Sequence, residues 1–164
     1  MTMSRTCCFT GHREYLYPFK AGSRQSELIK SKLKEDIGSA IQSGFDYFIV
    51  GGANGADEWA LDILSGMKAN GADISIEIAL PFASFPHKKG AADKETIVSL
   101  EKDPLCYEKR NRYMVEHSER IIAVYDEDYP IEGGTKQTVG FAVEAGLEIE
   151  FIRWHSLTDH HPET

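Results

Sequence analysis

A glycine-rich segment between an apolar run and a helical pattern is the first candidate for a ligand site. It runs from Gly51 to Asp57 with the sequence GGANGAD. Glycines let a backbone approach a ligand closely, and free amides at a helix start attract a phosphate. We therefore name Gly51, Gly52, Gly55 and Asp57 as ligand-binding candidates. Asp57 either caps the helix or accepts hydrogen bonds from ribose hydroxyls, and a tight turn without a ligand is the alternative for the whole loop.

The spacing of this loop differs from two common nucleotide motifs. It is not Gly-x-Gly-x-x-Gly, and no Lys-Ser/Thr pair of a P-loop follows it, so neither ordinary dinucleotide binding nor ATP hydrolysis is specified. A side chain at position 55 is expected to cover the amides that face the phosphate. Gly55→Val is therefore expected to block ligand binding and to leave folding largely intact.

Two further polar loops follow apolar runs and add candidates for the same ligand. These candidates are Thr10, Gly11, Arg13, Gly133, Gly134 and Thr135. Arg13 is a phosphate anchor or, alternatively, a partner in a surface ion pair. His12 is either a proton carrier near neutral pH or a hydrogen-bonded structural histidine, and its role stays open. Because helix starts are electropositive, the loops would form one anion pocket if their strands are neighbours.

Rigid elements must hold these loops, and the chain alternates short apolar runs with amphipathic segments. The apolar runs predict about five strands, over Arg5–Phe9, Phe45–Val50, Ile74–Ala79, Arg120–Tyr125 and Leu147–Ile152. Helical spacing predicts helices over Gln25–Ser43, Asp57–Ala69, Asn111–Ser118 and Thr135–Ala145. This alternation indicates an α/β fold, a three-layer sandwich with a mostly parallel sheet and helices on both faces. Ligands of such sheets bind at the carboxyl ends of the strands.

Two parts of the chain fit the alternation poorly. Residues 81–109 contain three prolines and one short helical patch near Asp93–Glu101, and they are expected to form an ordered excursion or lid over the site. Residues 155–164 are expected to form a frayed tail, with His155, His160 and His161 solvated rather than bound to a metal. The sequence indicates no metal site and no cofactor.

Length, charge and hydropathy limit the class of protein. At 164 residues the chain is expected to form a single domain over 1–164. Its apolar runs fall far short of the roughly 18 residues that span a bilayer, and no secretory signal is recognisable, so a cytoplasmic protein is expected. Three cysteines without a Cys-x-x-Cys pair indicate neither a disulfide framework nor a zinc site. A net charge of −8 opposes binding to duplex nucleic acid.

In combination, these motifs resemble the SLOG superfamily of Rossmann-like proteins, and particularly its small YpsA-like branch, over nearly the whole chain. The segment Gly55–Leu61 resembles the glycine-rich helix start of the DNA-processing protein A branch, and residues 110–112 resemble its Arg-Asn-Arg segment. The loop Gly133–Thr135 is similar to a shortened Gly-Gly-x-Gly-Thr loop of the Lonely Guy phosphoribohydrolases. The resemblance implies a Rossmann-like fold that binds nucleotides or their derivatives. It also makes Arg110 a phosphate-binding candidate, with a solvated helix start as the alternative for Arg110 and Arg112.

The resemblance also sets the alternatives for function. We expect a binding or sensing domain for a nucleotide or an ADP-ribose-like small molecule, without a membrane partner, and a homodimer is compatible with the sequence. The first alternative is a nucleoside monophosphate phosphoribohydrolase. The resemblance implies that such an enzyme carries a glutamate where this chain has Thr138, and Glu144 lies two turns further along the helix. We therefore expect little hydrolysis and assign no catalytic residue. The second alternative is single-stranded nucleic-acid binding, which the acidic balance opposes.

Overall fold

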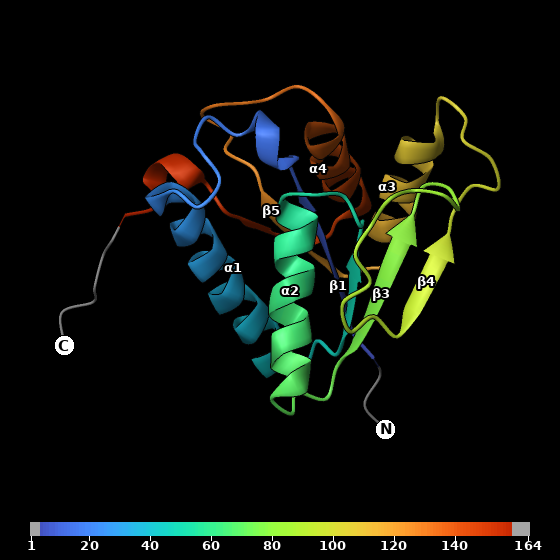
Figure 1. Cartoon of the computed structure of the whole chain (residues 1–164), viewed down its shortest axis with the longest axis horizontal. Coiled ribbons are helices and arrows are strands. Elements are labelled where there is room, and N and C mark those ends of the chain that lie inside the picture. The colour runs from blue at the N-terminus through green and yellow to red at the C-terminus, as the bar shows by residue number, and fades with distance from the viewer. Residues whose placement is uncertain (1–3, 159–164) are drawn as a thin grey trace.

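A six-stranded sheet with helices on both faces forms the centre of the computed structural model, which describes residues 4–158 (Figure 1). The strands are β1 Thr6–Gly11, β2 Tyr47–Val50, β3 Ser75–Leu80, β4 Lys94–Ile97, β5 Arg120–Val124 and β6 Glu148–Phe151. The helices are α1 Arg24–Gln42, α2 Ala56–Ala69, α3 Cys106–Glu116 and α4 Gly134–Ala145, with 3-10 turns η1 Glu14–Leu16 and η2 Trp154–Ser156. The predicted Rossmann-like α/β architecture is confirmed. None of the helices within residues 4–158 is long and apolar enough to cross a membrane.

The order of the strands reverses in the middle of the sheet. All neighbouring strands are parallel, in the order β4-β3-β2-β1-β5-β6. The chain builds the sheet outward from β1 to β4 and then returns to place β5 on the other side of β1. The order therefore reverses between β1 and β5, where open α/β sheets bind ligands at the carboxyl ends of their strands. Gly11 pairs with Val124 at this end, so the loops after both strands leave the sheet at the same level.

Two apolar layers hold the helices on the sheet. Helices α1 and α2 cover one face, and α3 and α4 cover the other (Figure 1). Ile29, Leu33 and Ile37 recur at helical spacing in α1 and are fully buried against the first face. Met114 of α3 and Ala142 of α4 pack on the second face. Because both faces are covered, the central strands are buried along most of their length, as is usual for parallel sheets.

Strand β4, which was not among the five predicted strands, corrects one expectation from the sequence. The helical patch predicted near Asp93–Glu101 is wrong, because Lys94–Ile97 is the strand β4 and pairs in parallel with β3. As an edge strand, β4 exposes most of its residues, so it lacks the apolar run that marks a buried strand. Residues 81–109 therefore extend the sheet as well as connect β3 to α3.

The carboxyl-terminal end of the described chain is anchored to the β5 side of the molecule. The backbone N–H of His155 donates to Asp126 Oδ2 at 3.0 Å, and the Nδ1 of its ring contacts the same oxygen. The other ring nitrogen lies 3.3 Å from Asp128 Oδ2. The frayed tail predicted for residues 155–164 therefore does not begin at residue 155. His160 and His161 lie outside the described residues.

Candidate functional site

A pocket of about 250 Å³, here called the main pocket, lies at the carboxyl ends of β1 and β5, where the strand order reverses. Its walls come from the end of β1 and the following residues up to Leu16, from the start of α2, from the first turns of α3 and from Glu132–Thr135 before and in α4. Its volume is near the lower end of the range for pockets that hold small organic ligands. The three polar loops predicted from the sequence thus meet at the carboxyl ends of the strands.

Most of the predicted site residues line the main pocket. These are Thr10, Gly11, Arg13, Asp57, Arg110, Gly133, Gly134 and Thr135. The three glycines Gly51, Gly52 and Gly55 lie in the same loop region but not in the wall of this pocket. Their roles in the structure concern the backbone, and binding of a ligand by any of these residues stays a prediction.

Two glycines let the end of β1 pack tightly on the start of α2. A side chain on Gly11 would collide with the Cβ of Ala56. Gly55 has a φ of +89°, and a Cβ there would lie 2.5 Å from the carbonyl oxygen of His12. The N–H of Ala56 donates to that same oxygen at 3.4 Å. The expectation that Gly55→Val leaves folding intact is therefore wrong, because Gly55 faces the backbone of residues 12–14 rather than a ligand.

Arg110 ties α3 to the ends of two strands. Its side chain is buried, and one terminal nitrogen donates to the carbonyl oxygens of Gly51 and, at 3.4 Å, Ala79. Its Nε donates to Asn111 Oδ1 at 2.9 Å. The solvated helix start that was the alternative for Arg110 is therefore wrong. Gly51 contributes its carbonyl oxygen to this contact, which explains why it lies behind the pocket wall.

Asp57 places a buried carboxyl group in the main pocket. Its side chain is 8% exposed, and Oδ1 has no hydrogen-bond partner within the described part of the chain. Burial raises the pKa of Asp57 to about 6, although the positive charge of Arg110 and the amides of Ala53 and Gly51 act in the opposite direction. The N-cap residue of α2 is Gly55, so Asp57 lies in the first turn instead of capping the helix. This oxygen is enclosed by protein, so a ligand donor reaches it only when the neighbouring groups shift.

Arg13 and the start of α4 bring positive charge to the same pocket. Within residues 4–158, the guanidinium of Arg13 forms neither an ion pair nor a hydrogen bond, and its central carbon lies 6.0 Å from the ring centre of Tyr107. The surface ion pair considered for Arg13 is therefore not formed. Helix α4 starts at Gly134 after a glycine N-cap without a side-chain cap, so its first amides are available at its electropositive end.

His12 is a buried neutral side chain in the pocket wall. It is 3% exposed, and the rings of Tyr17, Tyr125 and Trp154 lie with their centres 5.3, 5.7 and 5.9 Å from its own. Burial lowers the pKa of His12 to about 4, so the imidazole is neutral at neutral pH. Its Nε2 has no hydrogen-bond partner among the described residues. This environment argues against a proton carrier that titrates near pH 7.

Several residues of the pocket escaped the sequence analysis. They are Tyr15, Leu16, Ala53, Tyr107, Asn111, Met114 and Glu132. Tyr15 is 75% exposed. In the sequence it lies two residues after Arg13, and an aromatic residue so close to a candidate phosphate anchor could have indicated a surface on which a base stacks. Glu132 is a second carboxylate at the rim and pairs with Lys136 at 2.6 Å. Glu132 directly precedes the predicted Gly133–Thr135 loop, and this position in the sequence could have identified it as a pocket residue.

Three residues considered in the sequence lie away from the main pocket. The guanidinium of Arg112 stacks on the ring of Phe141, 3.9 Å from its centre. Glu144 lines a separate hollow together with Arg112. Thr138 is fully buried, and its hydroxyl donates to the carbonyl oxygen of Gly134 at 2.7 Å. Among the described residues, α4 therefore presents no carboxylate to the main pocket.

Curated relatives are similar to this chain in sequence, and solved structures are similar to it in fold, both at low sequence identity. A UPF0398 protein of Enterococcus faecalis is 22% identical over 145 residues, covering 79% of this chain and 81% of the relative. A UPF0398 protein of Bacillus thuringiensis is 25% identical over 170 aligned positions, covering 92% of this chain and 91% of the relative. The molybdenum cofactor carrier protein of Chlamydomonas reinhardtii is similar with a TM-score of 0.57 and 14% identity, over 91% of this chain and 76% of that one.

A second solved structure is DNA processing protein A from Helicobacter pylori, described for its single-stranded DNA binding mode. It is similar with a TM-score of 0.59 and 16% identity, over 90% of this chain and 64% of that one. At these identities the likeness shows the fold alone. The family model described as the YspA SLOG family, however, matches residues 7–157. The resemblance inferred from the motifs is thereby confirmed, and the chain belongs to the YspA SLOG family.

Proposed function

We propose that the chain binds a nucleotide or a nucleotide derivative in the main pocket. The observation that carries this proposal is the meeting of three groups in one pocket. They are the uncapped start of α4, the unpaired guanidinium of Arg13 and the unpaired Oδ1 of Asp57. The first two suit an anion, and the third suits a hydroxyl or amino donor. A phosphorylated ribose offers both kinds of group.

The phosphate would lie at the start of α4. The backbone amides of Gly134 and Thr135 belong to the positive end of that helix, and anions bind readily there. Arg13 can add a charge-assisted hydrogen bond without breaking an existing one. The start of α2 is less suitable, because the N–H of Ala56 already donates to the His12 carbonyl.

Asp57 would accept a hydrogen bond from the sugar or the base. A buried acceptor without a partner costs free energy, and a ligand donor would remove that cost. Arg110 stands beside Asp57 and favours its ionised form, which is the better acceptor. The exposed ring of Tyr15 at the rim offers a face on which a base can stack.

The two solved neighbours support a binding role in general terms. One is described as a carrier of the molybdenum cofactor and the other as a protein that binds single-stranded DNA. These descriptions agree with a binding role and do not distinguish a small molecule from a strand.

Titration calorimetry with matched ligands tests the proposal. Adenosine and AMP, and the corresponding guanosine and cytidine pairs, are compared with the parent protein and with Arg13→Ala. At least one nucleotide is expected to bind, its nucleoside is expected to bind more weakly, and Arg13→Ala is expected to weaken the nucleotide about ten- to a hundred-fold. Arg112→Ala is the matched control, since Arg112 lies on Phe141 away from the pocket. Binding of no nucleotide or nucleotide derivative would overturn the proposal.

A further inference from the structure

Asn111, one of the pocket residues that the sequence analysis missed, holds an unused pair of hydrogen-bond donors. It lies in α3 directly after Arg110, is 8% exposed and lines the main pocket. Its NH2 group bonds to no acceptor within residues 4–158, and unlike Asp57 Oδ1 this group is not enclosed by protein. A buried side chain that leaves two donors open to a pocket indicates a ligand with acceptor atoms.

The orientation of the Asn111 amide is fixed by Arg110. A guanidinium carries donors only, so the atom of Asn111 that meets Arg110 Nε at 2.9 Å is the carbonyl oxygen Oδ1. The NH2 group is therefore left for the side of α4. A Cβ placed on Gly134 would lie 3.6 Å from Asn111 Nδ2, so these donors lie beside the first residue of that helix.

The start of α4 contributes a second open side-chain donor. Thr135 is 6% exposed and lines the main pocket, and its hydroxyl has no partner in the described part of the chain. Because the N-cap Gly133 supplies no side-chain bond, the first amides of α4 are also uncovered. Backbone amides, a hydroxyl and a side-chain amide thus lie together at one end of the pocket, where an anion with acceptor oxygens would bind.

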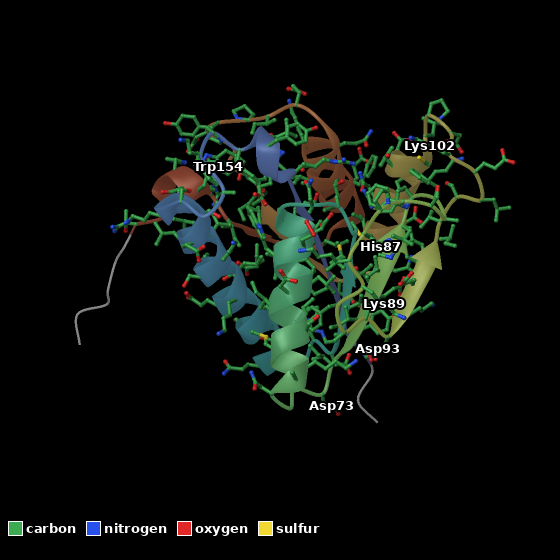
Figure 2. The ribbon with its side chains drawn as sticks, in the orientation of Figure 1. Asp73, His87, Lys89, Asp93, Lys102 and Trp154 are labelled. Carbon is green, nitrogen blue, oxygen red and sulfur yellow. The ribbon has the colours of Figure 1, made fainter. Side chains whose placement is uncertain are left out.

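The charged side chains at the start of α3 are directed away from this position. Lys102, which Figure 2 shows near the amino-terminal end of α3, has its ammonium 5.2 Å from the ring centre of Phe82. Lys109 pairs with Asp103 at 3.3 Å. Neither lysine lines the main pocket. From α3, the neutral Asn111 rather than a lysine therefore faces the start of α4.

We propose that Asn111 is a further ligand-binding residue, which donates through its NH2 group to the anionic group at the start of α4. This inference rests on the proposed function, because the anion is the phosphate of the nucleotide in the main pocket. Asn111 then also determines specificity. An oxygen that only accepts hydrogen bonds is favoured there, and an amino group, which would meet the NH2 group with its own hydrogens, is disfavoured.

Calorimetry with Asn111→Asp tests this inference. The variant keeps an acceptor for Arg110 Nε and nearly the same shape, but it replaces both donors by a carboxylate oxygen. The probes are AMP, GMP and CMP together with their nucleosides. Affinity for the nucleotides that bind the parent is expected to fall at least about ten-fold, and affinity for the nucleosides is expected to change little. Thermal denaturation without ligand checks that the variant is folded.

Gly134→Ala tests the same donors without a change of charge. Its methyl group would lie in ordinary contact with Asn111 Nδ2 and would cover it. The variant is expected to bind the nucleotide about ten-fold more weakly, with little further loss when it is combined with Asn111→Ala, because both changes remove the same hydrogen bonds. Gly140→Ala in the same helix is the matched control, since its Cβ would have no neighbour within 4 Å and lies outside the pocket wall.

Nitrogen NMR of the side-chain amides provides an independent readout. The NH2 signal of Asn111, identified by its absence in Asn111→Asp, should shift when the nucleotide is added to the parent protein. An unchanged signal at saturation, or equal affinity of the nucleotide for parent and Asn111→Asp, would overturn the inference and leave the proposed function standing. If neither these nucleotides nor any nucleotide derivative binds the parent, the proposed function and this inference both fail.

Discussion

At the scale of single residues, Asp57 combines a cost to folding with a use in binding. Its pKa rises from 3.8 to about 6 on burial, so the folded protein resists ionisation of this group. The stability that comes from the protonated carboxyl is complete below pH 3.8 and is lost as the pH rises through 6. The free protein above pH 6 therefore keeps a destabilising charge at the position where a ligand donor would bind.

Asp57→Asn is expected to change stability in a pH-dependent way. At pH 8 the variant should gain free energy of unfolding relative to the parent, by up to about 3 kcal/mol more than at pH 4. Urea denaturation at both pH values measures this difference. An equal effect at pH 4 and pH 8 would contradict the raised pKa. The same variant should bind nucleotides more weakly than the parent.

His12 gives a second residue-scale prediction. Because burial lowers its pKa to about 4, its ring resonances should not titrate between pH 6 and pH 8, as measured by NMR of the histidine side chains. The stability that comes from the neutral ring is present above pH 6.5 and is lost as the pH falls toward 4. A titration midpoint near pH 6.5 for His12 would mean that water reaches its ring between the rings of Tyr17, Tyr125 and Trp154.

At the scale of elements, the contact between β1 and α2 depends on Gly55. Gly55→Val would force a β-branched residue into φ +89° and against the His12 carbonyl, so it should lower the free energy of unfolding by about 2 kcal/mol or more. Gly66→Ala on the same helix is the matched control. No neighbour lies within 4 Å of the new Cβ there, and the change should stabilise the helix by about 0.5–1 kcal/mol. Thermal and urea denaturation of both variants decide the matter, and a Gly55→Val protein as stable as the parent would refute the backbone role.

The start of α4 gives the prediction on catalysis. The hydroxyl of Thr138 donates to the helix backbone, so α4 offers no carboxylate at the position where the resemblance implies a glutamate in the phosphoribohydrolases. Loss of such a carboxylate costs several kcal/mol, or about a thousand-fold in rate. Chromatography should therefore detect no free base from nucleoside monophosphates over hours. If base is released rapidly, Asp57 and Glu132 are the carboxylates of the main pocket to replace by alanine, and Glu144 serves as the control away from it.

The buried strands and the edge strand β6 could be predicted from the sequence, and the other edge strand, β4, could not. Central parallel strands are apolar on both faces, and the runs that ended at Phe9, Val50 and Ala79 therefore identified β1, β2 and β3. The edge strand β4 is identified only by its pairing with β3, because its exposed residues carry no apolar period. Long-range backbone contacts of this kind leave no local signal.

The site shows the same division. Polar loops at the ends of strands pointed to Arg13, Asp57 and the start of α4, because topology brings such loops together. The role of Gly55 depends on how close two backbones come, and the role of Arg110 depends on carbonyl oxygens of two strands. Neither distance can be read from residue types. The sequence therefore predicted where the pocket lies, but it did not predict the structural roles of Gly55 and Arg110.

At the scale of the whole molecule, the net charge of −8 favours binding of a small ligand over binding of a nucleic-acid strand. The cations that line the main pocket are Arg13 and Arg110, and Arg110 already donates to backbone carbonyls. A strand that met only these two charges would show a slope of about −1.4 in a plot of log K against log salt concentration. Proteins built to bind strands use a longer positive groove and have a steeper slope.

We therefore expect oligonucleotide binding to be weak and its dependence on salt to be shallow. Fluorescence anisotropy with a labelled twelve-residue oligothymidylate, from 50 to 300 mM salt, measures both quantities, and calorimetry with ADP-ribose over the same range provides the small-molecule comparison. Because the acidic surface repels phosphates outside the pocket, the oligonucleotide should bind no more tightly than ADP-ribose at 150 mM salt. A slope steeper than about −3 would require more than about four phosphate contacts, which is more than the main pocket offers. It would place the binding surface elsewhere on the molecule, and Arg13→Ala would then leave that slope almost unchanged.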